Sequence, residues 1–553
     1  MNESSRLNSN SYDNSNRSST SDRTMTAEYS TNREGGQRME SFETSMVSID
    51  SSSSSSDMPN LNDSSSFSST LEKPKLGLWP MAVMVFYGVS GGPFGIEAAV
   101  RSGGNFYALV GFLVMPFCWS LQEALMTAEL GTAFPEASGG VAWVEEAFGP
   151  LMGWMAGFLS WVSGATDNAI YPVLFLDYLL QNIGTNGDPA TMGPVLRFGL
   201  IASTTIGLAY VNWRGLDLVG KLSVLICFVA MSPFVILVIV GAFKVDPSRW
   251  WEGRDDGTNN MDDDLGGGLL PNLTYGGVLW RPFLNNLFWN LNSFDSAGCL
   301  VAELESGVSF VRAMMLGLIM VVSCYFLPLL IAIGSSDASS SDWADGYLTT
   351  INAEVVGPWL GAWTVFSAGI SNVGLFQAEL SSDAFQIMGM ADRGYFPKIF
   401  SERSKHGTPT YALLLGTCVI VLMTLSDLDM LMEMLNFNYG FALLFEYAAF
   451  FKLRISKPDL ARPYKIPLGT TGCALLFLPT ITTIIFVMSL ATYETYFFSL
   501  GVWITAYLLY AVRKRGSSDS IRDINQRGSY ERVQSDELSF EDDEELEEEV
   551  TVT

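Results

Sequence analysis

The sequence predicts an all-α protein that crosses a membrane about twelve times. Its apolar residues occur in blocks of about twenty with almost no charge, the length that crosses a bilayer core. Two of these blocks, the first and the sixth, are interrupted by glycine or polar residues that should break a helix. The acidic excess of the chain, a net charge of -27, lies mainly outside the blocks.

Polar segments flank the apolar blocks. Residues 1–72 contain the serine run 51–56 and few apolar side chains, so they cannot bury enough surface to offset chain entropy. Residues 541–549 are almost wholly acidic, as solvated tails often are. We therefore expect a disordered tail at 1–72, a transmembrane domain at 73–515 and a second disordered tail at 516–553. Because the membrane block is near neutral, we expect no nucleic-acid partner.

The apolar blocks define twelve expected spans. Their approximate ranges are 76–100, 105–130, 150–181, 195–211, 218–243, 282–303, 311–334, 358–388, 409–425, 430–451, 470–490 and 494–512. Basic residues gather between spans eight and nine, between ten and eleven, and after the last, whereas the loop 335–357 has acids but no Lys or Arg. The positive-inside rule then places both termini in the cytoplasm and the long loop 244–281 outside.

The first span contains the run YGVSGGPFGIE at residues 87–97. Four glycines and a proline remove side-chain packing and one backbone donor, and Glu97 closes the run. Unsatisfied backbone survives in a membrane only where it lines an enclosed cavity, so this break indicates a binding site of a secondary transporter. The alternative is a kink that serves helix packing alone.

A second break lies five spans later, in the run FWNLNSFDSAG at residues 288–298. Amide and hydroxyl side chains fall close together there and an acid follows, in a segment that must cross lipid. Breaks in spans one and six are what a five-plus-five inverted repeat gives. The alternative is a polar helix buried in a bundle.

Metal and enzyme chemistry have little support in the sequence. None of the six cysteines has a partner at metal-ligand spacing, and the single histidine, His406, lies in a loop. No loop holds a nucleophile–base–acid set or a phosphate-cradling motif. We therefore expect no metal site, no cofactor and no enzymatic activity.

Several acidic residues lie within or beside the apolar blocks, where a charge at a helix centre costs about 3 kcal/mol. Three of them sit within about a turn of a span end, and for these we expect structural pairing: Glu129, Asp177 and Glu303. Glu97, Asp167 and Asp295 fall deepest, and for these we expect a function. Glu123 is open between a proton site and a packing role.

Further motifs connect these features to a known family. They are TAELGTAFPEASGG at 127–140, GGPFGIE at 91–97, DNAIYPVLFLDY at 167–178 and WNLN at 289–292. Over roughly residues 75–512 the chain resembles the plant and protist polyamine uptake transporters, the L-type amino acid transporter-like group of the amino acid–polyamine–organocation superfamily. The resemblance implies a twelve-span fold of the leucine-transporter type, alternating access, and uptake driven by protons.

The resemblance also implies that the unwound parts of spans one and six and the middle of span three line the substrate site. It carries over to Ser90, Gly91, Gly92, Asp167, Asn168, Tyr171, Trp289, Asn292 and Asp295. Trp289 takes the place of an aromatic gate. Some superfamily members place a proton-site lysine in span five, but residues 222–243 carry no charge here. The candidates for proton coupling are therefore Glu97, Glu123 and Asp295.

The deep acids bear on the substrate class. A polyamine has several ammonium groups and no carboxylate, so it needs separated anions or aromatic faces. Asp167, Asp295 and Glu97, with Trp289 and Tyr171, provide that pattern. An amino acid would instead be held largely by the free backbone groups of broken helices.

We therefore expect proton-coupled uptake of polyamines of the putrescine and spermidine class. The alternatives are an amino-acid transporter or exchanger of the same fold, and a non-transporting nutrient sensor. The expected partners are a small cationic substrate, protons, the lipid bilayer and regulatory proteins at the tails. We expect the plasma membrane as the location, with an endomembrane as the alternative.

The topology makes a testable prediction about N-linked glycan. Acceptor triplets begin at Asn2, Asn16, Asn62 and Asn272, but only Asn272 lies in a loop expected outside. Any glycan should therefore be lost on Asn272→Gln, measured as a mobility shift after glycosidase treatment. A glycan at one of the other three would invert the topology.

Overall fold

The computed structural model describes residues 75–182, 193–254, 269–270, 273–344, 346–425 and 428–514. The two predicted tails, 1–72 and 516–553, and the predicted glycan acceptor Asn272 lie outside these residues. The described part is helical except for loops and one antiparallel hairpin, β1 (Thr274–Tyr275) and β2 (Val278–Leu279).

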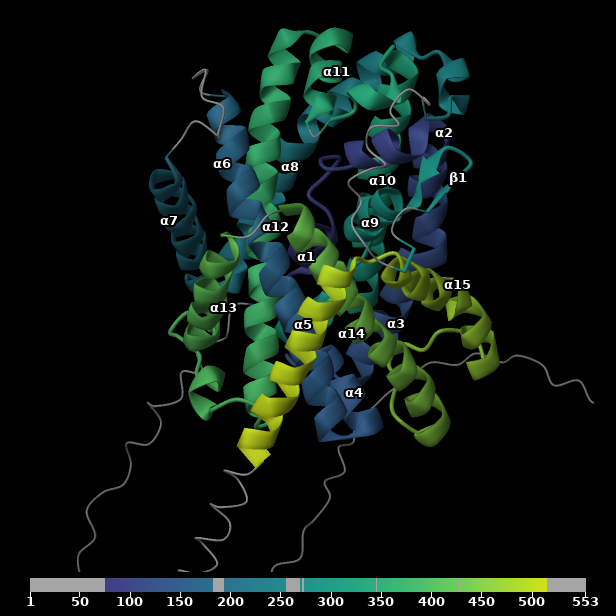
Figure 1. The fold of residues 1–553 in the computed structure, drawn as a ribbon. Helices are drawn as coiled ribbons and strands as arrows, with labels where there is room; N and C mark the ends of the chain where they lie inside the picture. The colour runs from purple at the N-terminus through teal and green to yellow at the C-terminus, as the bar shows by residue number, and fades with distance from the viewer. Residues whose placement is uncertain are drawn as a thin grey trace, which may run out of the picture. The chain divides into compact units, whose positions relative to one another are not determined.

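Most helices follow the expected spans in order (Figure 1), but two of them, Gly140–Phe148 and Tyr347–Val355, lie between expected spans. The first half holds α1 (Leu78–Val89), α2 (Glu97–Met115), a π-helical turn (Pro116–Ser120), α3 (Leu121–Ala133), α4 (Gly140–Phe148), α5 (Pro150–Asn168), α6 (Ile170–Asn182), α7 (Pro194–Trp213) and α8 (Leu216–Gly241). The second half holds α9 (Trp280–Leu291), the 3₁₀ helix η6 (Asp295–Glu303), α10 (Phe310–Ser335), α11 (Tyr347–Val355), α12 (Pro358–Asp392), α13 (Thr410–Met423), α14 (Leu428–Ser456), α15 (Thr470–Ser489) and a last helix, Tyr493–Lys514. Short 3₁₀ turns lie in the loops, at Ala242–Lys244, Pro247–Trp251, Ser340–Asp342 and Lys398–Ser401.

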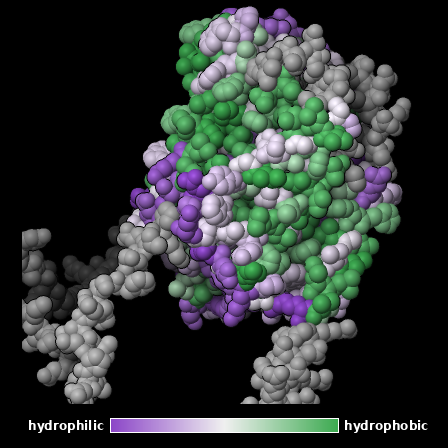
Figure 2. Space-filling model, turned by 90° about the vertical axis from the view of Figure 1, so that its left-hand side faces the viewer, coloured by the Kyte–Doolittle hydropathy of each residue, from purple (hydrophilic) through white to green (hydrophobic). Residues whose placement is uncertain are grey.

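Six of the described helical stretches are long and apolar enough to cross a membrane by themselves. They are Glu97–Ala133, Pro194–Trp213, Leu216–Lys244, Phe310–Ser335, Thr470–Ser489 and Tyr493–Lys514. Figure 2 shows hydrophobic side chains over most of this face, with hydrophilic ones gathered mainly at its lower left and along its bottom edge. This distribution is what a multi-pass membrane protein requires, while the count of twelve spans stays a prediction.

The predicted break in the first span is confirmed. Helix α1 ends at Val89 and α2 begins at Glu97, and Gly92 and Gly95 between them have φ of 89° and 78°. Glycine adopts this left-handed conformation without the strain that a side chain would add. A Cβ atom on Gly92 would also overlap the side chain of Met231 from α8.

The predicted break in the sixth span is confirmed as well. Helix α9 ends at Leu291, η6 begins at Asp295, and Ser293 between them has φ of 75°. Helix α9 contacts the first break, because the Asn286 side-chain amide donates a hydrogen bond of 2.6 Å to the carbonyl oxygen of Gly95. A side chain of the sixth span therefore satisfies exposed backbone of the first break.

The boundary between the first two spans is less distinct than expected. Helix α2 runs from the first break into the second span, and only Gly104, with φ of 76°, interrupts its dihedrals. A Cβ atom there would overlap the backbone of Arg254. The turn between the two spans is thus a single glycine packed against the long loop that follows α8.

The three acids expected to form structural pairs do so. Asp177 pairs with Arg197 at 3.1 Å, and Glu303 with Arg403 at 2.6 Å. Glu129, which is fully buried, accepts hydrogen bonds of 2.9 Å from Arg454 Nε and from the backbone N–H of Ile466. These last two pairs tie α3 to α14 and η6 to the loop after α12.

Breaking the buried pair should destabilise the protein far more than breaking an exposed one. Glu129→Gln leaves the Arg454 guanidinium, 3% exposed, without full compensation, which should cost about 3–5 kcal/mol. The control is Glu146→Gln, because Glu146 and its partner Lys457 are about 40% exposed and their pair should contribute about 0–1 kcal/mol. The melting temperature of each variant is measured by size-exclusion chromatography after heating. Equal melting temperatures for the two variants would contradict the expectation.

Candidate functional site

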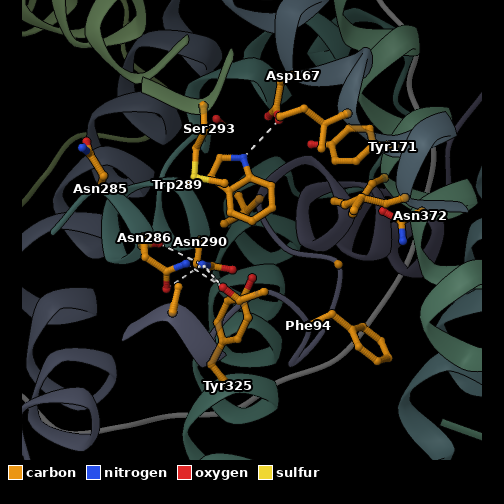
Figure 3. A pocket seen from close by; sticks show the side chains of 18 of the residues that line it. Phe94, Asp167, Tyr171, Asn285, Asn286, Trp289, Asn290, Ser293, Tyr325 and Asn372 are labelled. Carbon is orange, nitrogen blue, oxygen red and sulfur yellow. Dashed lines mark hydrogen bonds between the residues drawn. The ribbon is translucent and has the colours of Figure 1, made fainter. Parts of the chain in front are cut away.

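A cavity of about 450 Å³ lies where the two breaks face each other. We call it the outer cavity. Its lining comes from the end of α1, the first break, α2, the α5–α6 junction, α9, the second break, α10, α12 and α14. Figure 3 shows labelled side chains from the two breaks, the α5–α6 junction, α9, α10 and α12 around this space. The volume suits a small organic molecule.

Trp289 and Asp167 form the central contact of the outer cavity. The indole Nε1–H of Trp289 donates a hydrogen bond of 3.0 Å to Asp167 Oδ1 (Figure 3). Tyr171, one turn after Asp167, lines the same cavity. One carboxylate thus lies beside two aromatic rings, a combination that suits a cationic group.

The rest of the lining is rich in neutral polar groups. Asn286 and Asn290 are linked by a hydrogen bond of 2.8 Å from Asn290 Nδ2 to the Asn286 carbonyl oxygen. On α12, the Ser371 hydroxyl donates to the carbonyl oxygen of Gly91, and Asn372 follows it in the lining. Such groups orient a ligand without adding charge.

Two lining residues of the outer cavity form an ion pair: Arg281, near the start of α9, and Glu433, near the start of α14. Arg281 Nε donates a hydrogen bond of 3.0 Å to Glu433 Oε2. Glu433 also accepts from Thr495 Oγ1 at 2.6 Å and from the Thr492 backbone N–H at 2.7 Å. Its charge is thereby held by α9 on one side and by the start of the last helix on the other.

A second, smaller cavity of about 30 Å³ lies beside the outer one, and we call it the inner cavity. Asp167 and Ser293 line both. Asp295 lines the inner cavity, where the Tyr439 hydroxyl is close enough to bond both Asp295 and Glu123, the latter at 2.8 Å. The backbone N–H of Asp295 also donates to Glu123 Oε1 at 3.2 Å.

The predicted site residues divide between these two spaces and their supports. Gly91, Asp167, Tyr171 and Trp289 line the outer cavity, and Asp167 and Asp295 line the inner one. The remaining predicted residues are buried or partly buried near the cavities without being among the described lining residues: Ser90, Gly92, Glu97, Asn168 and Asn292.

Four of these remaining residues, Ser90, Gly92, Asn168 and Asn292, have supporting contacts. The Ser90 hydroxyl accepts a hydrogen bond of 3.1 Å from the Gly92 N–H, inside the first break. Asn168 Nδ2 donates to Asp383 Oδ2 at 3.0 Å, and Asn292 Oδ1 accepts from its neighbour Ser293. Asn168 therefore orients a carboxylate of the inner cavity.

Sequence reasoning missed several acids of the two cavities. Glu379, Asp383 and Glu446 line the inner cavity and Glu433 lines the outer one. All four fall within the spans expected at 358–388 and 430–451. The i, i+4 pair Glu379 and Asp383 was a visible signal, because two acids on one face of an apolar helix need a reason.

Comparison with known proteins places the chain in a family. The amino acid permease family model matches residues 76–509. A probable polyamine transporter of Arabidopsis thaliana is 40% identical over 453 residues, which is 81% of this chain and 89% of the relative.

Two further relatives have similar coverage. Polyamine transporter PUT1 of Oryza sativa subsp. japonica is 39% identical over 423 residues, 76% of this chain and 75% of its own. Polyamine transporter RMV1 of Arabidopsis thaliana is 37% identical over 436 residues, 79% of this chain and 84% of its own. The protein is therefore an integral multi-pass membrane transporter, not an enzyme, and it belongs to the amino acid permease family.

Proposed function

We propose that this protein transports polyamines of the putrescine and spermidine class, by alternating access and coupled to protons. The observation that carries the proposal is the Asp167 carboxylate, placed between two aromatic side chains in the outer cavity. The relatives named as polyamine transporters support the same substrate class.

The outer cavity matches the chemistry of a polyamine. An ammonium group gains from the charge of Asp167 and from the faces of Trp289 and Tyr171. Phe94 and Leu375 supply apolar surface for the methylene groups between the ammonium groups. The neutral amides of α9 can accept hydrogen bonds from further N–H groups without fixing one length of substrate.

The membrane potential favours uptake of such a substrate. Each positive charge that moves inward gains about 2.3 kcal/mol per 100 mV, so a trivalent cation gains about 7 kcal/mol. Proton coupling then serves mainly to return the empty carrier, if a buried acid must be neutralised for that step. Glu123 and Asp295, which share the Tyr439 hydroxyl, are the candidates with a direct contact to each other, and Glu97 stays a third.

Alternating access requires one end of the protein to open while the other closes. Arg393, at the end of α12, bonds Glu136 at 2.7 Å and Glu145 of α4 at 2.7 Å. With the Glu129–Arg454 pair, these contacts tie together the end that carries the basic loops, where α4 and the last helix end in Figure 1. We propose that this end is cytoplasmic and closed here, within a twelve-span, five-plus-five fold in the plasma membrane with both termini inside.

An amino acid is the second candidate substrate. Arg101 and Arg281 line the outer cavity and could bind a carboxylate. Arg281 already has Glu433 as its partner, which weakens this candidate. Concentrative uptake would exclude the further alternative, a non-transporting sensor.

Uptake by the purified protein in liposomes tests the substrate class. We expect labelled spermidine to be concentrated, with putrescine competing at least tenfold better than leucine or arginine. An imposed inward proton gradient should raise the rate. The opposite order of competition would favour the amino-acid transporter, and binding without uptake would favour the sensor.

Removing the charge of Asp167 should strongly reduce the uptake of spermidine into liposomes. Asp167→Asn removes the carboxylate that pairs with a buried ammonium group of the substrate, which should reduce the free energy of binding by about 2–5 kcal/mol. Asp295→Asn should weaken uptake by a similar amount. Asp217→Asn is the control, because Asp217 forms an exposed pair with Lys221. Wild-type uptake at subsaturating spermidine in the Asp167 and Asp295 variants would remove both residues from the site.

Substitution within the first break should end transport while the protein still reaches the membrane. A Cβ atom on Gly91 would contact Leu375 Cδ1 at 2.5 Å at the edge of the outer cavity, and Gly92 has a left-handed φ. Gly91→Val and Gly92→Val should therefore abolish uptake per correctly inserted molecule. If the break served packing alone, expression would fall at least as much as uptake.

A further inference from the structure

The inner cavity lies deeper along the same helices as the outer one. On α12 the outer cavity is lined by Ser371, Asn372 and Leu375, and the inner one by residues from Glu379 to Gln386. From Leu375 to Asp383 a helix rises about 12 Å. Helix α14 shows the same order, and both helices run toward the end with the basic loops. The two cavities therefore follow one another along the same helices and share Asp167 and Ser293 in their linings.

The lining of the inner cavity is strongly acidic. Five of its described residues are acids: Asp167, Asp295, Glu379, Asp383 and Glu446. No lysine, arginine or histidine is among the described residues that line it. By contrast, Glu129, Asp177, Glu303 and Glu433 each have an arginine partner. Carboxylates this crowded must be neutralised by protons or by a bound cation.

Two of these carboxylates have an unused acceptor. Glu446 is 3% and Glu379 8% exposed, and the Oε2 atom of each has no hydrogen-bond partner among the described residues. A buried acceptor left without a donor is costly unless a ligand supplies one. An ammonium group brings three donors and a positive charge.

The helices next to these acids leave space for them through glycine. A Cβ atom on Gly164 of α5 would overlap Asp383 Oδ1, and one on Gly140 of α4 would overlap Glu446 Oε1. Neither glycine has a positive φ, so neither is needed for backbone conformation. Both line the inner cavity, and their small size sets the positions of two carboxylates.

We propose that the inner cavity is a second cation subsite, in which Asp383 and Glu446 bind the leading ammonium group of a polyamine. This proposal rests on the proposed function, because the subsite would bind the second ammonium group of the same polyamine substrate. A cavity of about 30 Å³ has room for about two groups of water size, which suits an ammonium group and the methylene group that carries it, while the rest of the chain stays in the outer cavity. Asp167, shared by both cavities, holds the following ammonium group.

The test compares two amines that share a four-carbon chain. Putrescine has an ammonium group at each end, and n-butylamine has one. Binding of each to the purified full chain in nanodiscs is measured by calorimetry for wild type, Asp383→Asn and Glu446→Gln. We expect putrescine affinity to fall at least tenfold in both variants while butylamine affinity changes less than twofold. Glu146→Gln, which removes an exposed acid, should leave both affinities unchanged.

A glycine variant keeps every charge and still tests the subsite. Gly164→Ala should displace the Asp383 carboxylate and lower putrescine affinity selectively, as Asp383→Asn does. Gly207→Ala on α7, where a Cβ atom would meet nothing within 4 Å, is its matched control. If Gly164→Ala lowers putrescine affinity but not butylamine affinity, and its melting temperature is normal, then the subsite has been disturbed and the fold has not.

Other outcomes would overturn the inner subsite. Equal weakening of both amines, or no weakening of either, contradicts it. Unchanged putrescine affinity with an altered proton or sodium dependence of uptake would show that Asp383 and Glu446 carry one of those ions instead. If wild type concentrates arginine but binds neither amine, the proposed polyamine function itself fails, a result distinct from failure of the subsite alone.

Discussion

The structure depends on one constraint, that backbone exposed inside a membrane must find partners within the protein. Two spans are interrupted, and their free groups are satisfied by side chains from elsewhere in the fold. Asn286 bonds the Gly95 carbonyl oxygen, Ser371 bonds that of Gly91, and the Ser293 N–H donates to the Tyr439 hydroxyl at 3.1 Å. Since the partners come from α9, α12 and α14, the breaks fix the helices that surround the cavities.

The same contacts connect the backbone to the carboxylates. The Tyr439 hydroxyl lies between the Ser293 N–H, Asp295 and Glu123, so a change of charge at either acid reaches the second break directly. Asp167 likewise connects two parts of the site, because it lines both cavities and accepts a hydrogen bond from Trp289. A substrate that takes over Asp167 must compete with that indole, which couples binding to movement of the aromatic side chain.

The sequence predicted the fold well because its signals are local. Span length, the glycines of residues 87–97 and the polar run at 288–298 each act over a few residues, and the structure has helices and breaks there. The pairing of Glu129, Asp177 and Glu303 was predictable from their positions near span ends. Which arginine each would meet was not, because the arginines lie 20, 100 and 325 residues away in other segments of the fold.

The site was predicted less completely for the same reason. Asp167 and Trp289 were found through motifs, but Ser371, Asn372, Glu379 and Asp383 lie on α12, whose long apolar pattern has no break to mark it. Helix packing alone decides which face of α12 meets the cavities. Glu97 looked equivalent to Asp167 in the sequence, yet it lies buried at the start of α2 and is not among the described lining residues of either cavity.

The Glu129–Arg454 pair has a consequence for synthesis of the chain. The two residues are 325 positions apart, so the ribosome completes α3 long before the arginine exists. Until then the carboxylate must stay at the membrane surface or keep a proton, because lipid does not tolerate an unpaired charge. Helix α3 can therefore take its final position only after α14 has been made. A nascent chain that stops before residue 454 keeps Glu129 without its Arg454 partner, which distinguishes it from a finished chain.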